Sequence, residues 1–303
     1  MKKLGIIVVL VCGMLAIMAG SAFAYGGPHV AFTATNNDGC AGCHVTHAAK
    51  GAKLLTANTQ TDFCFLCHAG SGSSLNALEG TNTGTGNYVT AGGFNLEDQK
   101  NEAGVITVPG HTSVHTMGSN VSIPGGGAGI TGGFQCGSCH NPHGSDNARI
   151  LKTVVNGVTT APVTMTVTNN TVVSYDGGIN QWCAACHTRF NAAVNAGHDK
   201  TNDALGMYRH AMGVSAVLPT GANGNIVTGT PLEANKVACL TCHRAHGTKA
   251  KMVGSYSNGS LGGLYRDNGT GFEKGVVGSA LLRLNDRGVC FNCHNGATDN
   301  LPK

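Results

Sequence analysis

The sequence predicts one domain that is mostly coil, with short helices and at most a small β-hairpin, built around a core that its own side chains do not supply. The composition indicates this: of 303 residues, 46 are Gly, 5% are aromatic and 11% are charged. Gly-rich chains lose more conformational entropy than usual on folding. A domain of this length normally offsets that loss by burying bulky apolar side chains. Another group must therefore fill the interior.

The first 24 residues have the pattern of a Sec signal peptide. Lys2 and Lys3 precede an apolar run over residues 4–19, and Ala22-Phe23-Ala24 is a small-x-small cleavage site. We expect cleavage after Ala24, which leaves a mature domain of residues 25–303 and removes Cys12; an uncleaved anchor is the alternative. The protein is therefore expected to be exported.

Twelve cysteines remain, and they form six Cys-x-x-Cys pairs that are each followed directly by His. Two thiols three residues apart bond to the two vinyl groups at one porphyrin edge, and the adjacent His binds the iron as proximal ligand. The six motifs are Cys40/Cys43/His44, Cys64/Cys67/His68, Cys136/Cys139/His140, Cys183/Cys186/His187, Cys239/Cys242/His243 and Cys290/Cys293/His294. We therefore expect six covalently attached haem c groups in a single haem-cored, multihaem cytochrome c domain.

Other uses of paired cysteines fit this pattern poorly. Six disulfides would suit an exported protein, but they would not place His after every pair. Zinc ribbons do not require that His, thioredoxin-type sites occur singly, and iron–sulfur sites space their cysteines differently. Haem attachment remains the best interpretation.

Eight further histidines could supply the second axial ligand of each iron. They are His29, His47, His111, His115, His143, His198, His210 and His246. Six irons need six such ligands, so every iron could be bis-His with two histidines to spare. The mature methionines show no spacing relation to the motifs, which makes Met ligation the weaker alternative. This count predicts low-potential electron-transfer haems and does not require an open iron.

Three of these histidines lie three residues after a proximal His: His47, His143 and His246. The attachment segment holds the backbone on the proximal face of its own haem, so each should ligate a different haem. The arrangement occurs only at motifs one, three and five, which predicts three haem pairs.

Between the motifs, the sequence predicts little regular structure. Residues 69–135 are rich in Gly and are expected to form a loop. Each attachment segment is expected to be a short helix, as is the region near 188–196. Residues 151–175 are rich in Val and Thr around Asn156-Gly157, which predicts the β-hairpin; an irregular loop is the alternative. An exposed hairpin edge could serve subunit contact.

The charge pattern narrows the classes of partner. A formal net charge of +4 with no basic stripe argues against nucleic acid. After the signal peptide no apolar run is long enough to span a membrane.

The ordered motif set resembles the extracellular hexahaem cytochromes of the OmcS type. The segments that carry the resemblance are Gly27-Pro-His29, Cys40-Ala-Gly-Cys-His-Val-Thr-His47, a long Gly-rich loop, Phe134-Gln-Cys-Gly-Ser-Cys-His-Asn-Pro-His-Gly144, Gln181-Trp-Cys-Ala-Ala-Cys-His187, Tyr208-Arg-His210, Cys239-Leu-Thr-Cys-His-Arg-Ala-His246 and Cys290-Phe-Asn-Cys-His294. The resemblance covers the whole mature chain in motif order.

The resemblance implies filaments in which every iron is bis-His. Carried over to this chain, the distal ligands would be His29, His47, His115, His143, His210 and His246, with His111 and His198 spare. It also implies that His47 ligates a haem of the adjacent subunit, the fifth, in a helical head-to-tail homopolymer.

The function implied is electron transfer by a secreted, extracellular or cell-surface filament that exchanges electrons with other cytochromes and external acceptors. We expect an electron-transfer protein rather than an enzyme. The alternatives are a soluble periplasmic electron shuttle, in which His47 is used internally, and a multihaem reductase with one open iron.

Overall fold

The computed structural model describes residues 29, 38–85, 89–100, 106–108, 110–118, 120–121, 123, 129–168, 172–190, 210, 212–213, 231–250, 265–267, 272–274, 281–284, 289 and 293. The predicted signal peptide, the spare histidine His198, and Cys290 and His294 of the sixth motif lie outside these residues.

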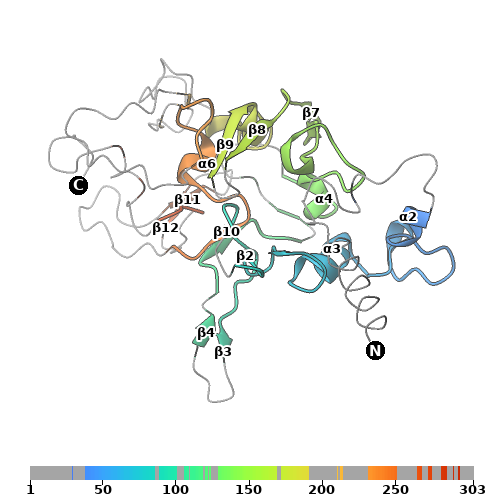
Figure 1. The fold of residues 1–303 in the computed structure, drawn as a ribbon. Helices are drawn as coiled ribbons and strands as arrows, with labels where there is room; N and C mark the ends of the chain where they lie inside the picture. The colour runs from blue at the N-terminus through green and yellow to red at the C-terminus, as the bar shows by residue number, and fades with distance from the viewer. Residues whose placement is uncertain are drawn as a thin grey trace, which may run out of the picture.

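Coil dominates the described residues, and the helices are short, as predicted (Figure 1). The helices are α2 (Asp38–Ala41), α3 (Gln60–His68), α4 (Cys136–Cys139), α5 (Ile179–Ala184) and α6 (Cys239–Cys242), with 3-10 turns η1 (Ala52–Leu54), η2 (Ala148–Ile150) and η3 (Thr188–Phe190). Each of the five helices carries one or both cysteines of a motif, so the prediction of helical attachment segments is confirmed for motifs one to five. Among the described residues, no helix has the length and apolarity to cross a membrane.

The expectation of at most one small hairpin was wrong, because the described residues contain six two-stranded antiparallel sheets. They pair β1 (Leu75–Asn76) with β2 (Thr81–Asn82), β3 (Gln99–Lys100) with β4 (Ile106–Val108), β5 (Ser113–Val114) with β10 (Gly247–Thr248), β6 (Val154–Val155) with β7 (Val158–Thr159), β8 (Thr164–Thr168) with β9 (Val172–Gly177), and β11 (Tyr265–Asp267) with β12 (Phe272–Lys274). Pairs this short give almost no periodic signal in a sequence.

The predicted hairpin within residues 151–175 is present and is followed by a second one. Asn156 and Gly157 both have positive φ, 50° and 77°, as the tight turn between β6 and β7 requires. Strands β8 and β9 then pair with Met165 opposite Tyr175. Tyr175 is thereby brought into the interior, where it is 4% exposed.

The Gly-rich segment predicted as a loop includes five described strands, β1 to β5: β1 pairs with β2, β3 pairs with β4, and β5 reaches across the chain. Strand β5 pairs with β10, which follows the fifth motif, so that Val114 lies opposite Gly247. Gly92 allows this approach, since its φ is +76° and a Cβ there would collide with the carbonyl of Gly247. The result is that His111 and His115 lie beside the fifth motif although they are far from it in sequence.

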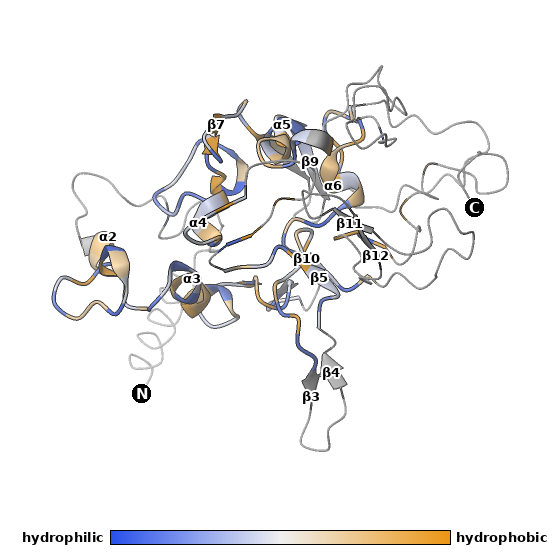
Figure 2. Cartoon of the chain, turned by 180° about the vertical axis from the view of Figure 1, so that it is seen from behind, coloured by the Kyte–Doolittle hydropathy of each residue, from blue (hydrophilic) through white to orange (hydrophobic). Residues whose placement is uncertain are grey.

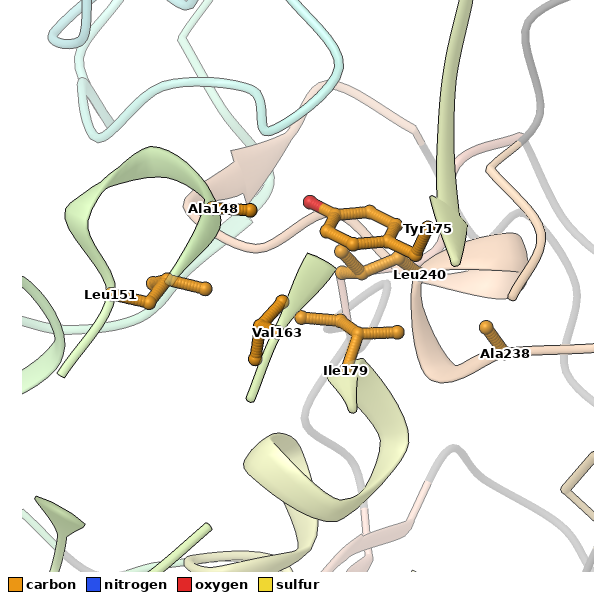
Figure 3. Close-up of a cluster of buried hydrophobic side chains, with 7 residues drawn as sticks. All are labelled: Ala148, Leu151, Val163, Tyr175, Ile179, Ala238 and Leu240. Atoms are coloured by element: carbon orange, nitrogen blue, oxygen red, sulfur yellow. The ribbon is translucent and has the colours of Figure 1, made fainter. Parts of the chain in front are cut away.

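The described residues enclose one small hydrophobic cluster (Figure 3). Its members are Ala148, Leu151, Val163, Tyr175, Ile179, Ala238 and Leu240. Figure 2 shows the remaining hydrophobic residues dispersed in short stretches along several elements rather than gathered in one layer. A chain this sparsely packed is consistent with the expectation that bound groups complete the interior.

Asn147 holds the coil around this cluster. It is 1% exposed; its side chain accepts from the backbone N–H of Val163 at 2.9 Å and donates to the carbonyl of Lys152 at 3.1 Å. Asn147→Ala should leave the N–H of Val163 buried and unpaired, at about 1–3 kcal/mol, whereas the carbonyl of Lys152 keeps the bond from Nε1 of Trp182 at 2.9 Å. We expect a lower melting temperature by calorimetry with unchanged haem absorbance. An unchanged melting temperature would contradict this role.

Candidate functional site

Four attachment motifs close with the same backbone hydrogen bond. The N–H of the motif His donates to the carbonyl of the first Cys, four residues earlier. The N···O distances are 2.8 Å for His44 to Cys40, 2.9 Å for His140 to Cys136, 3.0 Å for His187 to Cys183 and 3.0 Å for His243 to Cys239. One helical turn therefore separates the first thiol from the imidazole and places both on one side of the backbone.

Two motifs are also capped by the residue between their cysteines. Ser138 accepts through its hydroxyl from the N–H of Gln135 at 3.0 Å, and Thr241 accepts from the N–H of Ala238 at 2.8 Å. A side-chain oxygen that satisfies a free N–H stabilises so short a helix where the chain enters it.

A second repeated element, which the sequence analysis missed, packs against the proximal histidines. The backbone of Leu55 bridges to His44, that of Leu151 to His140, and that of Leu282 to His243. The sequence signal is the short repeat Ala52-Lys-Leu-Leu55, Ala148-Arg-Ile-Leu151 and Ala280-Leu-Leu282. Its irregular spacing from the motifs, especially for the third copy, hid it.

This element orients the imidazoles. The ring Nδ1 of His44 lies 2.7 Å from the carbonyl of Lys53, and that of His140 lies 3.0 Å from the carbonyl of Arg149. Only a protonated Nδ1 can donate to a carbonyl, so the lone pair remains on Nε2. Lys53 and Arg149 adopt positive φ, 62° and 55°, to present these carbonyls. The bond is the one that metal-bound histidines commonly make with their other nitrogen.

Four proximal histidines each lie at nearly the same distance from one of the predicted distal histidines. The ring centroids are 6.1 Å apart for His68 and His29, 6.1 Å for His44 and His143, 6.0 Å for His187 and His115, and 6.2 Å for His140 and His246. In each pair, residues distant in sequence meet.

This separation suits two imidazoles on opposite sides of one iron. A bond from a metal to an imidazole nitrogen is about 2 Å long, and the ring centre lies about 1 Å beyond that nitrogen. Two axial imidazoles therefore have centroids about 6 Å apart whatever the angle between their planes. The donor set fits a haem, whose porphyrin supplies the four remaining ligands.

Two of the predicted distal histidines also direct Nδ1 at a backbone carbonyl. The Nδ1 of His29 lies 3.0 Å from the carbonyl of Pro142, and that of His115 lies 2.5 Å from the carbonyl of Ala245. Burial lowers the pKa of His115 to about 4 and that of His246 to about 3. Both imidazoles are therefore neutral near neutral pH, which is the form that binds iron.

His111 differs from His115 in its hydrogen bonds. It is 5% exposed; its Nδ1 lies 2.8 Å from the carbonyl of Asn95, and its Nε2 accepts from the N–H of Gly93 at 3.1 Å. Both ring nitrogens are thus committed to the backbone. His111 joins two turns of the chain and leaves no lone pair for a metal.

The remaining predicted ligands have different surroundings. His47 and His210 are exposed, and His47 is in none of the histidine ring contacts between described residues. His47 lines an open pocket of about 520 Å³ together with Cys40 and His44. The segment that carries it, beginning with α2, lies at one edge of the molecule in both ribbon views (Figures 1 and 2).

The cysteines of successive motifs contact one another. Cys64 of the second motif is hydrogen bonded to Cys136 of the third, and Cys183 of the fourth to Cys239 of the fifth. Cys43 of the first motif lies near Cys67, and Cys139 lies near Cys186. Motifs one to five therefore follow each other in space in their order along the chain. The eleven described motif cysteines, which include Cys293, form no disulfide.

Comparison with known proteins finds the doubled CXXCH motif in this chain, over residues 33–72 and 128–158. The first match spans the first two attachment motifs, and the second spans the third motif with His143 and the Ala148-Arg-Ile-Leu151 repeat. No curated protein and no solved structure shows significant similarity. Proteins with this motif carry covalent haem c outside the cytoplasm and generally transfer electrons. The chain carries the doubled CXXCH motif, the signature of a multihaem c-type cytochrome.

Proposed function

We propose that this chain is a secreted hexahaem conductor that assembles head-to-tail into a filament and delivers electrons to external acceptors. The observation that carries the proposal is the set of four imidazole pairs at 6.0–6.2 Å, distributed over motifs whose cysteines contact in sequence order. When bound, each haem supplies an iron that cycles between the ferric and ferrous states.

The first four irons are bis-His in this proposal. Their proximal ligands are His44, His68, His140 and His187, and the corresponding distal ligands are His143, His29, His246 and His115. His143 and His246, which belong to the third and fifth motifs, thus ligate the first and third haems. The backbone of one attachment segment thereby reaches a second haem, which fixes the spacing of the two sites.

The contacts between cysteines support an unbroken path. Thiols of the second and third motifs touch, as do those of the fourth and fifth, so the attachment edges of the corresponding porphyrins are held close together. Short edge-to-edge distances are what electron hopping between haems requires. We infer that electrons pass through the haems in motif order.

His47 is the ligand that joins subunits. It is exposed, lies on a segment at one edge of the molecule, and belongs to the one doubled motif whose second His contacts no other described imidazole. A ligand donated to the fifth haem of the next subunit makes a heterologous contact, which propagates as an open filament when its rotation does not close.

Electron microscopy of the haem-loaded protein, sheared from cells and kept without denaturant, tests the proposal. Filaments with a regular repeat are expected. Monodisperse particles of a single chain at high concentration would overturn polymerisation and favour a soluble shuttle. If one haem of the intact filament bound carbon monoxide when reduced, the all-bis-His assignment would be overturned and a reductase favoured.

The angles between the paired imidazoles predict an electron paramagnetic resonance spectrum. The interplanar angle is 71° for His140 and His246, but 20° for His29 and His68 and 32° for His44 and His143. Near-perpendicular axial rings make the two upper t2g orbitals of ferric iron, which share three electrons, nearly equal in energy, and this gives a low-spin signal with a large maximal g value. We expect such a signal from the third haem and its loss in His246→Met. A spectrum without it would contradict this ligand pair.

A further inference from the structure

Arg283 is a half-buried cation with one buried donor group whose hydrogen bonds are incomplete. Its Nε donates to the carbonyl of Leu240 at 2.6 Å, and its backbone N–H donates to the carbonyl of Cys242 at 2.9 Å. Its Nη2 atom is buried and has no hydrogen-bond partner within the described part of the chain. The guanidinium is therefore held against the fifth motif, with one donor group that meets no acceptor among the described residues.

The described groups around Arg283 do not neutralise its charge. Burial and, to a smaller extent, the charge of Arg244 lower its pKa to about 10, although Tyr175 and Cys242 act in the opposite direction. None of these neighbours is a carboxylate. Withdrawing a cation from water without a counter-charge is unfavourable. An anion bound at the buried Nη2 would stabilise this arrangement.

A second cation and a hydroxyl lie next to it. Tyr175 is 4% exposed and is hydrogen bonded to the side chain of Arg149. Since the guanidinium can only donate, the tyrosine oxygen accepts this bond and its O–H remains available as a donor. Arg149, Tyr175 and Arg283 thus form a row of donors beside the hydrophobic cluster. Figure 3 shows the Tyr175 hydroxyl at the Ala148 side of that cluster.

A bound haem would supply an anion suited to these donors. Each porphyrin carries two propionate carboxylates at the edge opposite its thioether bonds, and an arginine fork binds a carboxylate through two donors. The chain has fewer Asp and Glu residues, 15, than Lys and Arg residues, 19. Bound propionates would supply the missing negative charge in the interior.

The position of Arg149 indicates which haem is involved. Its backbone carbonyl lies 3.0 Å from the Nδ1 of His140. His140 and His246 are the two rings that face each other across the third site, and the charge of Arg149 lowers the pKa of both. Arg149 therefore adjoins the third site.

We propose that Arg283, together with Arg149 and Tyr175, binds a propionate of the haem held between His140 and His246. This inference rests on the ligand pair of the proposed function. A ferrous haem with two propionates carries one more negative charge than the ferric form, so a nearby cation stabilises the reduced state. The donor row raises the potential of this haem above that of an otherwise equal bis-His haem and holds its propionate ionised.

The test is a redox titration of the assembled protein, followed at the paramagnetic signal assigned to this haem by its loss in His246→Met. Arg283→Met should lower the potential of this signal and make it depend on pH near neutrality, since the propionate then binds a proton more tightly in the reduced state. Arg283→Lys should retain most of the wild-type potential. Lys236→Met, at an exposed lysine, is the control and should leave the potential unchanged.

Infrared difference spectra with ¹³C-labelled propionates add a direct readout. The redox-linked carboxylate band should shift in Arg283→Met but not in Lys236→Met. Should Arg283→Met fail to mature, Arg149→Met is expected to lower the same potential. An unchanged potential and an unchanged band in the arginine variants would overturn this inference alone. A spectrum in which His246→Met removes no signal would overturn the ligand pair and this inference together.

Discussion

Replacing His47 with Ala should shorten or abolish filaments and convert one haem to the high-spin state. The imidazole is exposed and contacts no other described histidine of its own chain, so its loss should leave the other ligand pairs intact. If the contact between subunits is partly a metal–ligand bond, its removal should raise the concentration needed for assembly at least about tenfold, which corresponds to about 1.4 kcal/mol. Sedimentation and electron microscopy measure assembly, and visible absorbance measures spin state.

Two controls separate this role from a general effect on the surface. Lys50→Ala changes an exposed residue of the same segment and should leave both filaments and spin state unchanged. Free imidazole added to His47→Ala should restore the low-spin spectrum without restoring filaments, because it replaces the ligand but not the link. Normal filaments from His47→Ala would refute the joining role.

His115→Ala and His111→Ala should have opposite consequences, although the two residues are four apart and both are near the fifth motif. His115→Ala is expected to leave the fourth haem without its distal ligand, giving a high-spin signal and carbon monoxide binding by one of the six haems. The reason is that His115 faces His187 at 6.0 Å with its Nδ1 already bonded to the backbone. An unchanged spectrum would show that another residue ligates this iron.

His111→Ala should instead leave the haem spectrum unchanged and lower the melting temperature. The N–H of Gly93 would lose its partner, at about 1–3 kcal/mol, whereas the carbonyl of Asn95 would lose the ring Nδ1 but keep the backbone N–H of residue 111 at 2.7 Å. Burial lowers the pKa of His111 below its ordinary value of 6.5, so below that pH the unfolded chain binds a proton that the folded chain does not. Wild-type stability should thus fall as pH drops through this range, and less steeply in His111→Ala. A high-spin haem in this variant would contradict the structural role.

Local sequence determined the covalent chemistry. A thiol pair three residues apart followed by His needs only one helical turn to present all three groups together, and the hydrogen bond from His140 to Cys136 forms within that turn. The tight turn at Asn156-Gly157 was predictable for the same reason, because positive φ at both positions depends on those two residues. Neither feature needs information from elsewhere in the chain.

The tertiary structure decided what depends on distant segments. Whether His111 or His115 is free to bind a metal follows from which carbonyls and N–H groups lie nearby, and these come from residues 93–95 and from Ala245. His246 meets His140 only because the third and fifth motifs pack in one interior. The incomplete hydrogen bonds of Arg283 are likewise a property of burial, which no residue spacing encodes. Short-range bonds can be read from a sequence, whereas long-range pairing requires the fold that brings the partners together.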